Sequence, residues 1–450
     1  MSKKIIAHFS PARFIVLSFF CLISLGTLLL SLSISQIKPV PFIDVLFTAT
    51  SATCITGLFT VPMFHFTRFG QVIIVLLMQL GAFGLATISF FILSLFIDLG
   101  LATKLMAGRM LELKAWQNIK RILLFIIGTT LVFEILGAIA LFFVFNNMYS
   151  QYDAYFYAIF HSISSFCNAG VSFFHDVSEH HLEHLNKNVS FLFISSILMF
   201  SGGFGFITWR ELLLSLHKKF QGKKYRFSLQ TKIVFYGSFS LLVSSCVLFW
   251  ILEYDNTLQK MNFLELVANT LFHAISFKSC GFVTTDLFSF NAATILFMLI
   301  IGFIGSAPAS TGSGIRLTTF IIYLNTIKSA ILGRHSVEIL GRQITTDQVY
   351  KSIAIVSLSL GWIFLTTFCL LVTEQGWDFF SVLCEVTTSF TNVGLSLGGT
   401  NKLSTIGKLF ILITMCIGRI GSLTLVLGLK MAQQKELAEF SYPEERVMLG

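Results

Sequence analysis

Four short segments rich in Ser and Thr recur along the chain of 450 residues, and each ends in one glycine followed by an apolar residue. The segments are 48–58, 161–171, 273–282 and 385–395, and their glycines are Gly57, Gly170, Gly281 and Gly394. Successive glycines are separated by 113, 111 and 113 residues, so one unit is repeated four times. The side chains before each glycine differ, which leaves the backbone carbonyls as the chemistry that the segments share. A loop that turns successive carbonyls toward one axis needs dihedral angles that a Cβ resists and glycine permits.

Four such loops around one axis would form a ring of oxygens that can replace the hydration shell of a monovalent cation. The negative C-terminal ends of the four short helices would point at the water-filled cavity. The alternative is that the glycines are ordinary helix C-caps, but four in register favour the ring. The predicted ion-binding groups are the backbone carbonyls of Ile55, Thr56, Gly57, Asn168, Ala169, Gly170, Ser279, Cys280, Gly281, Asn392, Val393 and Gly394.

Other metal chemistry and catalysis are not expected. The eight cysteines are scattered without a CxxC pair, and Cys54, Cys167 and Cys280 fit packing behind a carbonyl ring, which suits hard alkali ions. His180 and His184 have the i,i+4 spacing of a metal pair, in a cluster with His175 and His181, but no third ligand is assured. An enzyme would need a nucleophile, a base or a metal set at one depth, and the chain lacks such a cluster. We therefore expect no catalytic residues, no transition-metal site and no cofactor in this chain.

The elements that position the loops must lie in a membrane. The chain is 55% hydrophobic and 12% charged, with a mean hydropathy of +0.81, which excludes an ordinary soluble domain. Stretches long enough to cross a bilayer are 14–34, 71–97, 122–145, 189–208, 233–252, 287–315, 352–373 and 409–429. Segments 41–53, 153–166, 262–277 and 377–390 are too short to cross and indicate re-entrant helices. The predicted fold is an all-α membrane protein with eight transmembrane helices and four re-entrant pore helices, arranged as four tandem units around one central pore.

The positions of the charges predict the orientation. Lys and Arg concentrate in alternate connections, so both termini should be cytoplasmic, and the net charge of +9 reflects topology and not a nucleic-acid partner. The run Lys218, Lys219, Lys223, Lys224 and Arg226 then belongs to a cytoplasmic loop. The expected division is a cytoplasmic N-terminus (1–13), pore unit 1 (14–97), a cytoplasmic loop (98–121), pore unit 2 (122–214), a basic cytoplasmic loop (215–232), pore unit 3 with a broken inner helix (233–327), a cytoplasmic loop (328–351), pore unit 4 (352–429) and a cytoplasmic C-terminal tail (430–450).

A break and a charge inside the membrane suggest a gate. Pro308 and two glycines interrupt the stretch 287–315, so the helix must break there. Polar, flexible backbone below the ring could obstruct the cavity, although a simple kink is the alternative. Arg419 lies deep in the last stretch, where a cation is costly unless it faces water or a partner, and it is the candidate pore barrier. The predicted gate residues are Ala309, Ser310, Thr311, Gly312, Ser313 and Gly314.

The remaining charges have structural or ion-related roles, and for most of them two interpretations stay open. Glu134, the one acid within a predicted stretch, is either a structural partner of a polar group or a coupling site. Lys278 is expected to anchor its loop to a neighbouring acid. Six outer acids either concentrate cations at the mouth or form a solvated surface. They are Asp44, Asp153, Glu265, Asp286, Asp378 and Glu385.

These motifs resemble the Trk/Ktr/HKT superfamily of cation transporters, whose single chain carries four units that are each similar to one potassium-channel subunit. The resemblance covers nearly the whole chain and is most specific in 51–58, 160–170, 305–319 and 418–425. The chain is most similar to the membrane subunits of Ktr systems, because the first apolar stretch begins near Phe14. Ser313 departs from the family's usual glycine.

The resemblance implies a homodimer in a bacterial cell membrane, seated on a separately encoded cytoplasmic ring of nucleotide-binding regulatory proteins. It also implies a gate loop at 309–314 and a barrier role for Arg419. Serine at the first loop glycine goes with sodium selectivity in the plant branch, so Gly57 and its three counterparts imply potassium as the only bound metal ion. The expected function is potassium uptake, with Na⁺ as a possible activator. The alternative is a Na⁺-coupled or Na⁺-selective transporter of the same fold.

Overall fold

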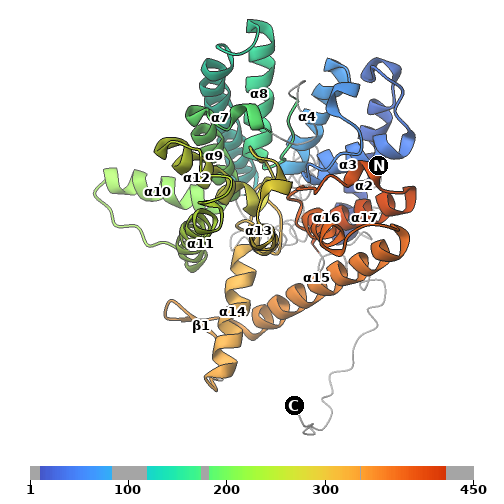
Figure 1. Ribbon diagram of the computed structural model, residues 1–450. Coiled ribbons are helices and arrows are strands. Elements are labelled where there is room, and N and C mark those ends of the chain that lie inside the picture. The colour runs from blue at the N-terminus through green and yellow to red at the C-terminus, as the bar shows by residue number, and fades with distance from the viewer. Residues whose placement is uncertain (1–10, 84–118, 174–181, 335, 422–450) are drawn as a thin grey trace, which may run out of the picture.

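The computed structural model describes residues 11–83, 119–173, 182–334 and 336–421, and these residues are predominantly α-helical. One order of elements occurs four times: a helix, a shorter helix that ends at a glycine loop, and a second helix (Figure 1). In the first unit these helices are α2 (Pro11–Leu30), α3 (Phe42–Cys54) and α4 (Arg68–Ala82). In the second unit they are α7 (Ile119–Phe145), α8 (Gln151–Cys167) and α9 (Val189–Gly203), followed by α10 (Phe206–Phe220).

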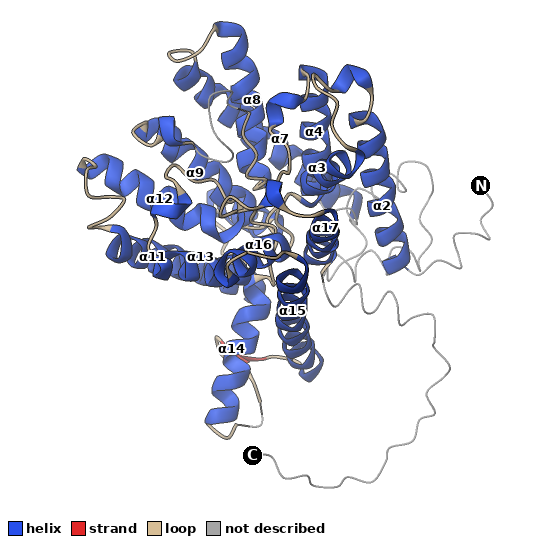
Figure 2. Cartoon of the chain, turned by 45° about the vertical axis from the view of Figure 1, so that its right-hand side comes forward, coloured by secondary structure: helices blue, strands red, loops and turns tan. Residues whose placement is uncertain are grey.

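The third and fourth units complete the chain. The third contains α11 (Leu229–Glu253), α12 (Phe263–Ser279), α13 (Ala292–Ile304) and α14 (Leu317–Ile331). The fourth contains α15 (Thr346–Thr373), α16 (Phe379–Thr391) and α17 (Thr405–Ile420). A small antiparallel pair, β1 (Glu338–Ile339) and β2 (Arg342–Gln343), lies in the connection between α14 and α15. Helix α14 extends away from the other helices (Figure 2), whereas α15 packs against α16 and α17 as well as α14.

The helices suit a bilayer because many large apolar side chains point outward, including Leu28, Phe143 and Phe364. By length and composition, three described helical stretches could each cross a membrane: Arg121–Phe145, Leu229–Glu253 and Thr346–Thr373. The bent pair α9 and α10 would add a fourth if it forms one span. The all-α prediction therefore agrees with the structure. The predictions made for 1–10, 84–118 and 422–450 lie outside the described residues.

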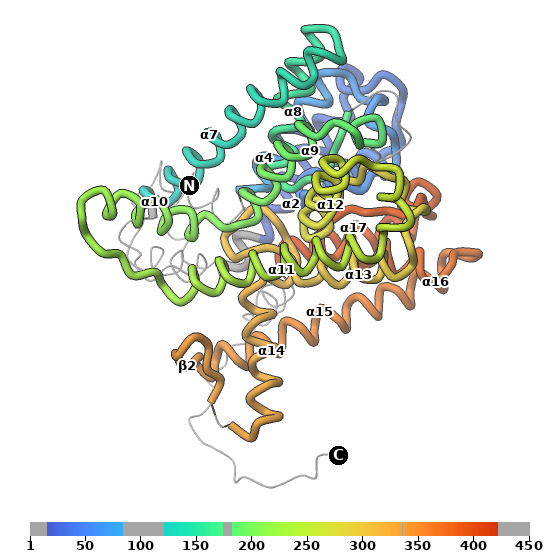
Figure 3. The backbone as a smooth tube through the Cα atoms, turned by 60° about the vertical axis from the view of Figure 1, so that its left-hand side comes forward, coloured from blue at the N-terminus to red at the C-terminus, as the bar shows by residue number. Residues whose placement is uncertain are grey.

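The structure corrects one predicted span. Stretch 189–208 was expected to be continuous, but α9 ends at Gly203 and α10 leaves it at an angle of 98° (Figure 3). Gly205 at the bend has a φ of +92°, which favours glycine. Gly202 also packs so closely on the Phe166 carbonyl that no side chain would fit there. In the third unit, α13 ends at Ile304 and α14 begins at Leu317, so 305–316 is not helical.

Apolar contacts join each unit to the next. One buried cluster contains Phe19 and Phe47 of the first unit together with Val386 and Ile411 of the fourth, so the two ends of the tandem array pack against each other. Another cluster unites helices of the first three units, and a further one unites the third and fourth. The four units therefore close into a ring, and the short helices α3, α8, α12 and α16 converge with their glycine loops inside it.

Candidate functional site

The four glycine loops (55–57, 168–170, 279–281 and 392–394) lie in contact with one another in a closed circle. Their glycines have φ angles of +67° to +87°. A Cβ built on any of them would strike the carbonyl oxygen of the residue before the glycine in the next loop. The contacts are Gly57 with the Ala169 oxygen, Gly170 with the Cys280 oxygen, Gly281 with the Val393 oxygen, and Gly394 with the Thr56 oxygen. Since the last contact returns to the first loop, the twelve predicted ion-binding residues are brought together.

The loops begin in two ways. In three of them the helix is ended by a residue in the left-handed conformation, namely Ile55, Asn168 and Asn392, with φ near +55°. In the third loop α12 continues through Ser279, and Cys280 keeps a φ of −114°. The third segment is also one residue shorter between its helix and its glycine, which accounts for one of the two residues missing from the spacing of 111. The ring is therefore not fourfold symmetric.

A hydroxyl on the preceding helix braces three of the loops. Ser164 Oγ donates to the Val171 carbonyl at 2.8 Å and accepts from the Val171 N–H at 3.0 Å. Ser276 Oγ donates to the Phe282 carbonyl, and Thr388 Oγ1 lies 2.7 Å from the Leu395 carbonyl. These residues were not singled out from the sequence, although a hydroxyl five or six residues before each glycine was a usable signal. The fourth counterpart is Ser51, whose buried hydroxyl has no hydrogen-bond partner.

Two asparagine side chains link adjacent loops. Asn392 Nδ2 donates to Thr56 Oγ1 at 2.7 Å, which joins the fourth loop to the first. Ser279 Oγ donates to Asn168 Oδ1 at 2.9 Å, which joins the third loop to the second. Asn168 Nδ2 also donates to Thr311 Oγ1 at 3.0 Å. The side chains before the glycines therefore hold the ring together, beyond the backbone role expected of them.

The predicted gate segment is interlocked with the bend between α9 and α10. Thr311 N–H donates to the Gly202 carbonyl, and Ala307 N–H donates to the Gly203 carbonyl, both at 3.1 Å. Phe206 N–H donates to the Ala309 carbonyl at 2.8 Å. Thr311 Oγ1 donates to the Phe166 carbonyl near the end of α8. The sequence analysis did not predict the bend between α9 and α10, and its backbone groups hydrogen-bond to loop 305–316.

Arg419 clamps the same loop from α17. Its guanidinium donates to the Thr311 carbonyl at 3.0 Å, to Ser313 Oγ at 2.7 Å and to the Gly81 carbonyl at 2.6 Å. Arg316 donates to the Gly312 carbonyl at 2.5 Å. Arg419 therefore ties the end of α4, loop 305–316 and α17 together. The hydroxyl of Ser313 takes part directly in this clamp.

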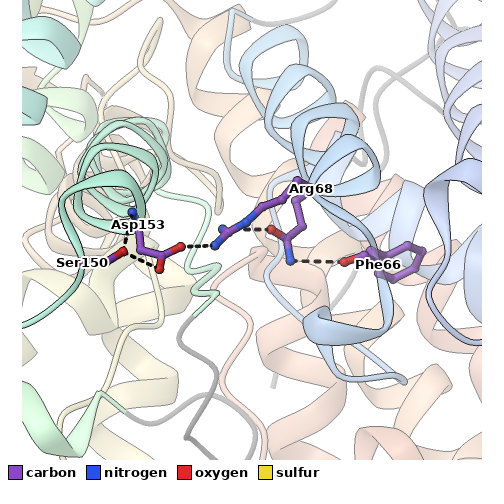
Figure 4. Close-up of polar contacts among 5 residues, drawn as sticks. Phe66, Arg68, Ser150 and Asp153 are labelled. Atoms are coloured by element: carbon purple, nitrogen blue, oxygen red, sulfur yellow. Dashed lines mark hydrogen bonds and ion pairs between the residues drawn. The ribbon is translucent and has the colours of Figure 1, made fainter.

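The outer acids have structural partners. Asp153 pairs with Arg68 at 2.6 Å and accepts from Ser150 Oγ (Figure 4), and Asp44 pairs with Lys408 at 2.6 Å. The first pair joins α4 to α8, and the second joins α17 to α3. The remaining acids serve helix ends or loops: Glu265 completes a capping box, Asp286 and Asp378 accept from backbone N–H groups, and Glu385 accepts from the Ser396 and Thr400 hydroxyls. Glu385 is fully buried, so neither expected role holds for it, an acid at the outer mouth or part of a solvated outer surface.

Besides Arg419, two charges singled out within the membrane are Glu134 and Lys278, and only Glu134 has a partner among the described residues. Glu134 accepts from Gln79 Nε2 at 3.1 Å and contacts Cys167 Sγ at 3.7 Å, between α4 and the end of α8. This agrees with a structural partner role. Lys278 has no acid beside it within the described residues, so the predicted anchor is wrong. The described part of the chain holds no group of three metal-ligating side chains, and His175, His180 and His181 lie outside it.

Comparisons with known proteins agree on one family. The family model of the TrkH cation transport proteins matches residues 6–439. The chain is 33% identical to the Ktr system potassium uptake protein B of Bacillus subtilis, over 98% of this chain and 97% of that protein. It is 31% identical to the potassium/sodium uptake protein NtpJ of Enterococcus hirae, over 100% and 99%.

A solved structure shares the fold. It is the potassium transporter TrkH from Vibrio parahaemolyticus, with a TM-score of 0.70 and 18% identity, over 93% of this chain and 85% of that chain. The family match, the closed ring of glycine loops and the apolar helices agree with one another and with the resemblance drawn from the motifs. The chain belongs to the TrkH family of cation transport proteins.

Proposed function

We propose that this protein is the membrane subunit of a bacterial potassium uptake system, in which the glycine loops form the selectivity filter. The proposal rests on one observation: four glycines with positive φ angles each contact a backbone carbonyl of the next loop, and the four contacts form a closed circle. Such a ring supplies many oxygen ligands at one axis and no side-chain charge, which suits a monovalent alkali ion. The relatives named as potassium uptake proteins support the same ion.

Flux through the filter is controlled by residues 309–314, with Arg419 as the barrier below the ring. Support comes from the contacts of the Arg419 guanidinium with Thr311 and Ser313. The chain works as a homodimer in the cell membrane, with both termini cytoplasmic and a separate nucleotide-binding ring as its regulator. It carries no cofactor of its own, and Na⁺ acts at most as an activator.

Sodium transport is the second candidate, and two observations favour it. The Enterococcus hirae relative is named a potassium/sodium uptake protein. The third glycine loop also departs from the backbone geometry of the others, so its carbonyls present a different set of ligands. A Na⁺-coupled or Na⁺-selective mechanism would need ion sites besides the carbonyl ring.

The test is Rb⁺ uptake into liposomes that contain the purified chain, with K⁺, Na⁺ or Li⁺ as competitor. We expect K⁺ to compete and Na⁺ not to, and we expect Gly57→Ser to lose this distinction because its Cβ would lie 2.6 Å from the Ala169 oxygen. Gly361→Ser is the matched control, since a Cβ on Gly361 in α15 meets nothing within 4 Å. Equal competition by Na⁺ in the wild type would refute potassium selectivity. Uptake that requires a Na⁺ gradient would favour the coupled mechanism.

A further inference from the structure

A small cavity of about 20 Å³ lies between α9, α11 and α12, beside Ser279 of the third glycine loop. Its lining includes Lys278 and the serines Ser238, Ser245 and Ser306, together with apolar residues of α9 and α11 such as Phe204. The mechanism proposed above uses none of these side chains. The cavity therefore combines a cation, several hydroxyls and an apolar wall in one place.

The polar groups of this cavity lack partners within the protein. Lys278 is partly buried in the last turn of α12 and has no hydrogen-bonding or ion-pairing group among the residues that the structure describes. The hydroxyls of Ser238 and Ser306 are buried and likewise make no hydrogen bond. Buried polar groups are normally satisfied, and an uncompensated ammonium inside a membrane protein is costly. A negatively charged oxygen acceptor in the cavity would compensate the Lys278 ammonium, whereas water would leave the charge uncompensated.

The cavity borders the lipid-facing surface. Phe200, Leu241 and Leu242 line it and are partly exposed. Ile197 on α9 and Val243 on α11, beside these residues in sequence, are each 59% exposed and suit contact with acyl chains. An acyl chain can therefore lie along the same apolar wall that leads to Lys278. These features favour a ligand with an anionic head and an apolar tail.

We propose that this cavity is a binding site for an anionic amphiphile, whose carboxylate or phosphate oxygens contact Lys278 Nζ and the hydroxyls of Ser238 and Ser306. Its occupancy acts on the proposed gate. Ser306 N–H donates to the Ser313 carbonyl, and Gly203, which also lines the cavity, accepts from Ala307 N–H. A ligand held by Ser306 would therefore stabilise loop 305–316 in the position described here. This consequence rests on the proposed function, whereas the binding itself does not.

Binding is tested with the full chain by native mass spectrometry after equilibration in phosphatidylcholine alone, with phosphatidylglycerol, or with oleate. We expect the wild type to retain one anionic amphiphile and Lys278→Met to retain it about tenfold less, as the loss of a charge-assisted contact predicts. Lys278→Arg should restore retention. Lys260→Met is the control because Lys260 is exposed and remote from the cavity lining. Ser238→Leu should block the cavity and also abolish retention while Lys278 stays in place.

Several outcomes would overturn the proposal. Equal retention by wild type and Lys278→Met, or equal loss in Lys260→Met, means that binding at this site does not occur. If inorganic phosphate in the buffer stabilises the wild type through Lys278 but neither amphiphile is retained, the ligand is aqueous and the lipid source is wrong. Rb⁺ uptake is measured in the same vesicles. Binding that leaves uptake unchanged refutes the link to the gate, whereas absence of uptake in every vesicle concerns the proposed function and leaves the binding result standing.

Discussion

Single hydroxyls behind the glycine loops stabilise the ring. The repeat also provides a control residue, because the serine at the corresponding position of the first unit makes no hydrogen bond. Ser164→Ala removes both hydrogen bonds to Val171 and leaves a buried N–H and a buried carbonyl without a side-chain partner. We expect the variant to be destabilised by about 2 kcal/mol and to discriminate less between Rb⁺ and Na⁺. Ser51 occupies the same place before Gly57 but makes no hydrogen bond, so Ser51→Ala should change neither property. Thermal unfolding in detergent and competition of Rb⁺ uptake measure the two effects.

Glu385 illustrates how a buried acid can support a loop without meeting an ion. Its carboxylate accepts from Thr400 at 3.0 Å and from Ser396, both of which follow the fourth glycine loop. Glu385→Leu would leave these two hydroxyls without their acceptor, so we expect lower thermal stability and weaker K⁺ competition against Rb⁺. Glu385→Gln keeps a carbonyl acceptor of the same length and should retain most of both. If Glu385→Gln loses as much thermal stability and K⁺ competition as Glu385→Leu, the role of Glu385 depends on its charge and not on these hydrogen bonds.

At the scale of elements, the clamp on loop 305–316 makes a prediction about Ser313. Its hydroxyl accepts from Arg419 at 2.7 Å, and hydrogen bonds to charged groups contribute about 1.5–3 kcal/mol. Ser313→Gly removes this bond, so Rb⁺ uptake should rise several-fold, up to about 10-fold. Ser310→Ala is the control, because Ser310 donates only to the nearby Ala307 carbonyl. An unchanged uptake rate in Ser313→Gly would show that the remaining Arg419 bonds suffice to hold the loop.

Elements differ in how much of them the sequence could predict. Helices α3 and α16 end one residue beyond the segments expected from composition, because the left-handed residues Ile55 and Asn392 end the helices where the glycine loops begin. The bend between α9 and α10 was missed because Gly202, Gly203 and Gly205 lie in an apolar run that reads as one span. Its cause is tertiary: the bend accommodates loop 305–316, which is about a hundred residues away in sequence. The partners of Arg419 on α4 and on that loop were unpredictable for the same reason.

At the scale of the whole molecule, two ion pairs join neighbouring units. They should contribute differently to the free energy of unfolding because one pair is exposed and the other is buried. Arg68 and Asp153 have side chains about 40% exposed, whereas Lys408 and Asp44 are 13% and 8% exposed. Exposed pairs contribute about 0.2–1 kcal/mol, while removing one partner of a buried pair costs about 3–5 kcal/mol. Lys408→Met should therefore lower the unfolding temperature far more than Arg68→Met.

The buried pair has a further role in closing the ring, since Lys408 and Asp44 join the fourth unit to the first and so connect the two ends of the tandem array. We expect Lys408→Met to weaken K⁺ selectivity as well, because Thr56 and Asn392 meet at this same boundary. The double variant Asp44→Asn with Lys408→Met should recover part of the lost stability, since it leaves no buried charge without a partner. A double-mutant cycle on thermal unfolding, repeated at high salt, measures the coupling. A coupling that salt abolishes would mean that the pair is solvated and does not close the ring.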